Sequence, residues 1–147
     1  MDDRVKKIQT PEKCEIFAKN CIAKGRMDLA NQARQRAVQL KAEAYGAKSA
    51  AEKEALEAVY AYEAVLTERN GRTTRASRTW QMIKKHGIIG AVERAVNRPD
   101  ETQGYKALID LGLEEYAFEA VILKYPSLFS PEAEKISKER MNERTSS

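Results

Sequence analysis

The chain has 147 residues, of which 33% are charged and 42% are hydrophobic, and it carries a formal net charge of +4. These proportions are typical of a folded globular protein and exclude disordered and collagen-like classes. A domain of this length buries roughly 70% of the surface of its unfolded chain, enough for a core without disulfides or metals. No run approaches the roughly 18 apolar residues of a membrane span, and residues 1–7 lack the apolar stretch of a signal peptide. We therefore expect a soluble, cytoplasmic protein with no membrane partner.

Three long helices are predicted in the N-terminal half, because apolar residues recur there at helical spacing between start and stop signals. Thr10 followed by Pro11 pairs an N-cap with proline at the first helical position. Asp28 is expected to cap the second helix, and Ser49 with Glu52 forms a capping box at the start of the third. Glycines end these helices, at Gly25, Gly46 and Gly71.

Shorter helices are predicted after this point in the chain, at residues 76–85, 88–97, 99–109, 114–124 and from 131 onward. His86-Gly87 separates the first two of them. The predicted fold class is therefore all-α, with an N-terminal three-helix hairpin array followed by a cluster of shorter helices. We expect one helical domain over residues 1–147, in which 10–70 and 72–142 are candidate subdomains.

Two cysteines and one histidine leave little room for metal or nucleophilic chemistry. Cys14 and Cys21 fall on one helix face but about 10 Å apart along the axis, too far for a disulfide, so we expect core thiols. Zinc sites need more histidine and cysteine than the chain has, and His86 is expected to cap a helix end. Catalysis would have to start from His86 with Arg78 and Tyr105. We therefore expect no enzyme, no cofactor and no metal.

The positive charge is concentrated in residues 71–98, which hold seven basic side chains and one acidic side chain. At about 100° per residue, the helix that begins there separates an apolar face from a basic face. The apolar face carries Ala76, Trp80 and Ile83. The opposite face carries Arg78, Gln81 and Lys85, with Arg75 at its edge. Hydroxyl groups lie between the arginines, on Thr73, Thr74, Ser77 and Thr79.

We hypothesise a small nucleic-acid-binding protein that contacts the phosphate backbone through a basic, helix-turn-helix-like region at residues 72–98. Arginine, lysine, glutamine and hydroxyl side chains all bond phosphate oxygens, and a loop before a helix start adds backbone N–H donors. Duplex DNA is the favoured partner, since single-strand binders expose aromatic residues, whereas the tyrosines here occupy mostly core-type positions and Trp80 is expected in the core. The candidate contacts are Arg72, Arg75, Arg78, Gln81, Lys84, Lys85, Arg94 and Arg98, with Gln81 a candidate for a base edge.

Two other interpretations remain open. The basic residues can pair with acidic segments of the same chain, at 49–70 and 114–119, or with an acidic protein partner. Alternatively the chain is a helical adaptor without a nucleic-acid role. That alternative rests on the alanine-rich hairpin and on an apolar cluster that must be buried either in this chain or in a partner. The cluster comprises Tyr116, Phe118, Val121, Ile122, Leu123, Leu128 and Phe129.

Overall fold

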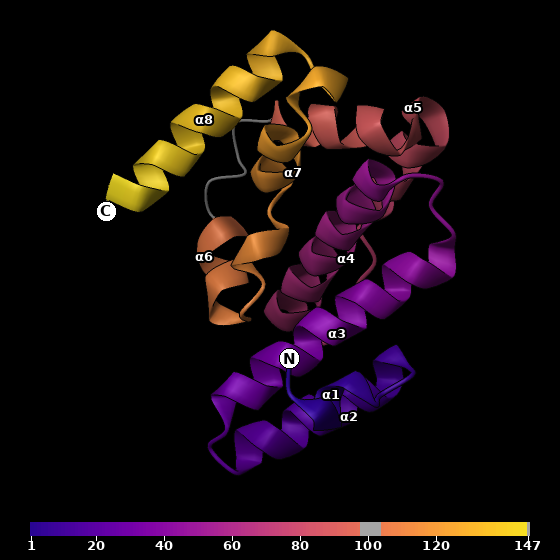
Figure 1. Cartoon of the computed structure of the whole chain (residues 1–147), viewed down its shortest axis with the longest axis vertical. Coiled ribbons are helices and arrows are strands. Elements are labelled where there is room, and N and C mark those ends of the chain that lie inside the picture. The colour runs from indigo at the N-terminus through magenta and orange to yellow at the C-terminus, as the bar shows by residue number, and fades with distance from the viewer. Residues whose placement is uncertain (98–103, 147) are drawn as a thin grey trace.

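The computed structural model describes residues 1–97 and 104–146, and every regular element within these ranges is helical (Figure 1). The predicted all-α fold class is confirmed. In chain order the elements are α1 (Asp3–Lys6), α2 (Pro11–Ala23), α3 (Met27–Tyr45), α4 (Ala50–Asn70), α5 (Ser77–Val96), α6 (Gly104–Asp110), the 3-10 turn η2 (Glu114–Tyr116), α7 (Phe118–Lys124), the 3-10 turn η3 (Pro126–Leu128) and α8 (Pro131–Ser146).

The long N-terminal helices pack as consecutive antiparallel neighbours. α2 lies along α3, and α3 in turn lies along α4 (Figure 1). Small buried residues line the contact between α2 and α3, among them Ala18, Ala30 and Ala33, so the two helices can approach closely. Cys14 and Cys21 are buried free thiols, as predicted, and burial raises the pKa of the Cys14 thiol.

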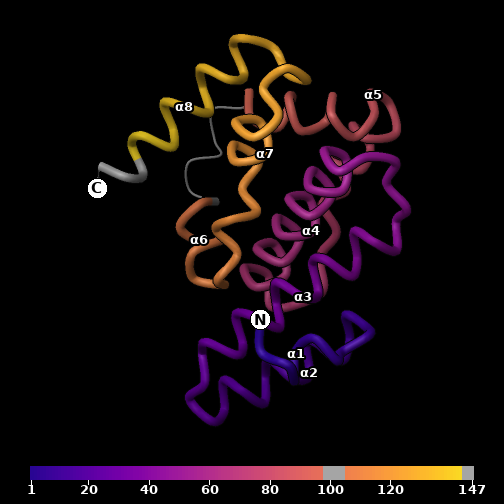
Figure 2. The backbone as a smooth tube through the Cα atoms, in the orientation of Figure 1, coloured from indigo at the N-terminus to yellow at the C-terminus, as the bar shows by residue number. Residues whose placement is uncertain are grey.

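α4 is the central helix of the molecule. It contacts α3, α5, α6 and α7, and Figure 2 shows its tube running between α3 and α7. Leu56 and Val59 of α4 are fully buried in one cluster with Val92 of α5 and Ile122 of α7. Burying a side chain of this kind contributes roughly 1.5–3 kcal/mol. This cluster therefore holds α5 and α7 against α4.

Local capping signals decide where two of the long helices begin. The Thr10 hydroxyl accepts the backbone N–H of Lys13 at 3.3 Å at the start of α2. The Ser49 hydroxyl accepts the backbone N–H of Glu52 at 3.1 Å at the start of α4. Each bond satisfies one of the donors that a helix start leaves without an internal partner, so both predicted starts are confirmed.

The predicted cap at Asp28 is wrong. The chain reverses at Gly25, which has a φ of +73°, and α3 begins at Met27 with Arg26 in the N-cap position. Asp28 consequently falls inside the first helical turn instead of before it. There its carboxylate pairs with Arg26 at 3.1 Å and still lies at the positive end of the helix dipole.

α5 consists of the two predicted short helices, joined at a kink. Gly87 has a φ of 81° and a ψ of 171°, a backbone conformation that is essentially restricted to glycine. The segments before and after it are helical, as the His86-Gly87 signal predicts. The next predicted helix start, at Pro99, lies outside the described residues.

The predicted continuous helix over residues 114–124 is wrong. Ala117 is extended, with a φ of −67° and a ψ of 147°, and separates η2 from α7. Tyr116 accepts a hydrogen bond from Gln39 of α3 at 2.9 Å, whereas Phe118 is buried against Tyr62 of α4. Residues two apart on one helix point in nearly opposite directions, so the break allows both rings to face the interior.

The turn at Gly112 provides a test of how closely α6 and η2 pack against α3. Its carbonyl accepts Gln35 Nε2 at 2.9 Å, its φ is +71°, and an added Cβ would lie 2.5 Å from Asn31 Cβ. We expect Gly112→Ala to lower the free energy of unfolding by about 2–4 kcal/mol, through backbone strain and overpacking. Gly46→Ala is the control, because its φ of +81° is similar but no atom lies within 4 Å. Equal losses in urea denaturation would contradict this contact.

Candidate nucleic-acid interface

The N-terminal half of α5 separates an inner face from an outer face, as predicted. Ala76 and Ile83 are buried, and Trp80 is half-buried beside them. The outer residues are all exposed: Arg78, Gln81, Lys84 and Lys85. Thr79, which the sequence placed among the hydroxyl donors, is only 4% exposed. This expectation is wrong because Thr79 falls next to Ile83 on the inner face, at about 100° per residue.

A single buried carboxylate fixes the start of α5. Glu63 of α4 is 7% exposed, and its Oε2 atom accepts three hydrogen bonds. The donors are the backbone N–H of Ala76 at 2.8 Å, Trp80 Nε1 at 2.6 Å and Arg75 Nε at 3.2 Å. α5 begins after Ala76, whose methyl group cannot accept a hydrogen bond. A carboxylate from another helix therefore does what a capping side chain does elsewhere, and it lies at the positive end of α5.

Trp80 lies in an aromatic cluster instead of deep in the core. Its ring stacks on Tyr45 with centroids 5.8 Å apart and an interplanar angle of 27°. It also meets the tilted ring of Tyr60 at 5.3 Å, and the guanidinium carbon of Arg75 lies 5.2 Å from its centroid. The ring thus joins the end of α3, the middle of α4 and the start of α5.

Most of the predicted contact residues are exposed cations without an acidic partner. Within the described part of the chain, no carboxylate forms an ion pair with Arg72, Arg78, Lys84 or Lys85. Arg94 is also exposed, and its Nη1 donates to the Gly90 carbonyl at 3.4 Å.

Two predicted contacts differ from this pattern. Arg75 is the exception among the predicted contacts that the structure describes, since it pairs with Glu63, although 66% of its side chain remains exposed. Arg98 lies outside the described residues.

Two acidic side chains of the segments that could have neutralised the basic region have partners elsewhere in the molecule. Glu54 of α4 binds Lys124 and Tyr125. Glu119 of α7 pairs with Arg140 of α8 at 3.2 Å, and both side chains are nearly buried. Among the described residues, Glu63 is the one acidic side chain of these segments that forms an ion pair with a residue of 71–98.

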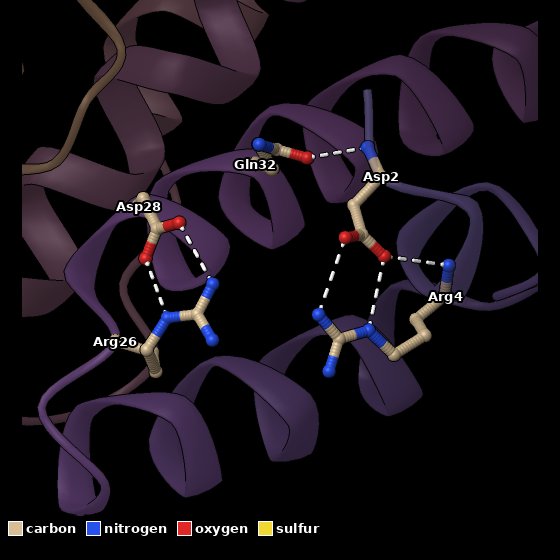
Figure 3. Close-up of polar contacts among 5 residues, drawn as sticks. All are labelled: Asp2, Arg4, Arg26, Asp28 and Gln32. Carbon is tan, nitrogen blue, oxygen red and sulfur yellow. Dashed lines mark hydrogen bonds and ion pairs between the residues drawn. The ribbon is translucent and has the colours of Figure 1, made fainter.

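Several cations of the N-terminal helices make internal contacts. Arg26 pairs with Asp28, and Arg4 pairs with Asp2, whose backbone N–H donates to Gln32 of α3 at 2.7 Å (Figure 3). The hydrogen bonds from Arg4 lower the pKa of Asp2 to about 2. Further along, Arg34 donates to Asn31, Arg36 donates to the Ile8 carbonyl and Lys41 pairs with Glu15. Of these cations, Arg36 and Lys41 join α3 to the chain that precedes it, and the others make local contacts.

The apolar cluster behind the adaptor interpretation is largely internal core. Phe118, Val121, Ile122 and Phe129 are buried within this chain. Leu128 is the exposed member, at 50%. The buried members therefore belong to one core cluster with residues of α4, α5 and α8 and do not form a continuous apolar surface for another protein.

Glu63 is the residue whose removal should disturb this arrangement most. We expect Glu63→Ala to lower the free energy of unfolding by about 2–4 kcal/mol, because the Ala76 and Trp80 N–H groups lose their acceptor in a buried position. Trp80 is the only tryptophan, so its fluorescence reports urea denaturation directly. Glu68→Ala is the matched control, since Glu68 is an exposed glutamate on the same helix and should change stability by less than about 0.5 kcal/mol. Similar losses in the two variants would refute the anchoring role.

Comparison with known proteins adds no functional assignment. No family model, curated protein sequence or solved structure matches this chain. Among residues 1–97 and 104–146, no helix is both long and apolar enough to cross a membrane. Nor do three or more histidine, cysteine, aspartate or glutamate side chains gather into a metal-binding group within those residues. The basic surface of α5 is therefore the feature that indicates a function.

Proposed function

We propose that the chain is a nucleic-acid-binding protein whose basic face contacts the phosphate backbone, with duplex DNA as the expected ligand. The basic face is defined here by Arg72, Arg78, Lys84 and Lys85. The observation that carries the proposal is that these four exposed cations lie within residues 72–85, a stretch without an acidic residue, and have no carboxylate partner in the described part of the chain.

Electrostatics favours a polyanion as the ligand of such a face. Cations that neutralise phosphates release the counterions condensed on the nucleic acid, and this release increases the entropy. The entropy gain drives binding that does not depend on the base sequence. Arg78 and Lys85 are separated by about 10 Å along the helix axis, or roughly three base-pair steps of one strand. The exposed Gln81 between them can reach a base edge.

The helix that carries the basic face is anchored to the core, which makes this charged face suitable for binding. Glu63 and the core residues Ile83 and Val92 hold α5 from its inner side. The outer side chains therefore project from a fixed backbone, which lowers the entropy lost on binding. The kink at Gly87 changes the direction of α5, so that Arg94 can contact a different part of the backbone.

Charge reversal on the basic face should weaken DNA binding without unfolding the protein. We expect wild type to bind a duplex of about 25 base pairs with log K falling against log salt at a slope of about −4 to −5. Arg78→Glu with Lys85→Glu should weaken binding at least about tenfold at low salt and make the slope shallower by about 2. Thermal stability should stay nearly unchanged because both side chains are exposed and form no ion pair within the described residues. Fluorescence anisotropy and thermal melts provide these measurements.

The matched control is Lys19→Glu with Lys24→Glu, which changes the net charge equally. Both lysines are exposed, Lys19 on α2 and Lys24 at its C-cap, and α2 lies at the far end of the molecule from α5 in Figure 1. This variant should retain most of the affinity. If both double variants lose affinity equally, binding follows net charge and not this face. If wild type fails to bind even at low salt, the proposed function is wrong.

Binding should also depend on pH through His86, the only histidine. Desolvation, then Arg94 and Lys85, lower the pKa of His86 below 6.5 in the free protein. A neighbouring phosphate would stabilise the protonated ring and raise that pKa. Affinity should therefore increase as the pH falls through the His86 pKa of the complex, and level off below that of the free protein.

NMR titration of the His86 ring with and without duplex measures this pKa shift directly. The variant His86→Gln should lose the pH dependence while keeping the salt dependence. An unchanged His86 pKa in the complex would place the phosphates away from this residue.

A further inference from the structure

A groove next to the aromatic cluster has the composition of a base-binding site. It has a volume of about 530 Å³ and an apolar lining that includes Pro11, Leu40, Ala44, Tyr45 and Tyr60. Pockets that enclose small planar ligands have volumes of this order. Tyr45 is 47% exposed, so part of its ring is open to solvent in the wall of the groove.

The exposed tyrosine is held rigidly from behind. Tyr45 stacks on Trp80, and Trp80 is fixed by its hydrogen bond to Glu63 and by the ring of Tyr60. A preorganised ring loses little conformational freedom when a second ring stacks on it. Base stacking on aromatic side chains contributes roughly 1–3 kcal/mol per base and tolerates any base. Tyr45 therefore provides a ready stacking surface.

Cations lie next to this surface and connect it to the basic face. The Arg75 guanidinium lies over Trp80, and Lys41 lines the groove itself. Lys84 follows Trp80 by four residues, so its exposed side chain emerges from nearly the same side of α5, one turn further on. A ligand in the groove that carries a phosphate would therefore find positive charge at the adjoining end of α5.

We propose that this groove binds one unpaired nucleobase, stacked on Tyr45, while the adjoining phosphates continue onto Arg75 and Lys84. This inference rests on the proposed function and refines it. The protein would prefer a nucleic acid with unpaired nucleotides next to a duplex over a blunt duplex. Gln9 and Glu12, which also line the groove, supply polar atoms for the edges of the base.

The experiment compares three probes: a blunt duplex of about 25 base pairs, the same duplex with an overhang of about five thymidines, and a free oligothymidine of about 15 nucleotides. Wild type should bind the overhang duplex about tenfold more tightly than the blunt one, the effect of one stacked base. Tyr45→Ala should lose this preference and bind the oligothymidine about tenfold more weakly, with blunt-duplex affinity unchanged. Tyr45→Phe should behave as wild type. Single-strand binding should also change the fluorescence of Trp80.

Two further variants separate loss of the site from loss of structure. Ala44→Leu adds bulk to the groove without removing any ring of the stack, and it should weaken overhang binding as Tyr45→Ala does. Leu128→Ala removes a similarly exposed apolar side chain on η3. It should change neither the affinity for the overhang duplex nor the affinity for the blunt duplex. Equal binding of both duplexes by wild type, or an undiminished preference in Tyr45→Ala and Ala44→Leu, overturns this inference but leaves the proposed function standing. Failure to bind all three probes overturns the proposed function itself.

Discussion

The three hydrogen bonds that Glu63 accepts connect the interior of the protein to its basic surface. One carboxylate oxygen joins α4 to the backbone of Ala76, to the indole of Trp80 and to the guanidinium of Arg75. A buried carboxylate is costly unless it has several donors, and here each donor belongs to the start of α5. The position of that helix start, and the direction in which its outer cations point, follow from this contact.

The distribution of the other carboxylates explains why the basic face stays positive. Glu119 satisfies Arg140 in a nearly buried pair, and Glu54 satisfies Lys124. Burial raises the pKa of Glu57, another carboxyl group of α4. Glu54 and Glu119, two of the acidic residues that offset residues 71–98 in the sequence, are therefore directed toward other helices.

Trp80 connects the basic face to the groove, because it is part of α5 and stacks on Tyr45. Its helix carries Arg78 and Lys85 outward, and its ring supports Tyr45 at the groove wall. Phosphate contacts position a nucleic acid without specifying it, whereas stacking requires a base that is not paired. A surface with both features would distinguish unpaired from paired nucleotides, so the ligand that we propose is a duplex with unpaired nucleotides next to it.

The sequence alone predicts the interactions between residues that lie close together in the chain. The helix starts at Thr10 and Ser49, the break at His86-Gly87 and the two faces of α5 depend on residues within one or two turns of each other, and all were predictable. Three other features depend on how the helices pack in three dimensions. They are the contact of Glu63 with α5, the stacking of Tyr45 on Trp80, which lies 35 residues later in the chain, and the break at Ala117. The spacing of residues in the sequence indicates which side of a helix each residue occupies. Which neighbour it meets on that side depends on how the helices pack.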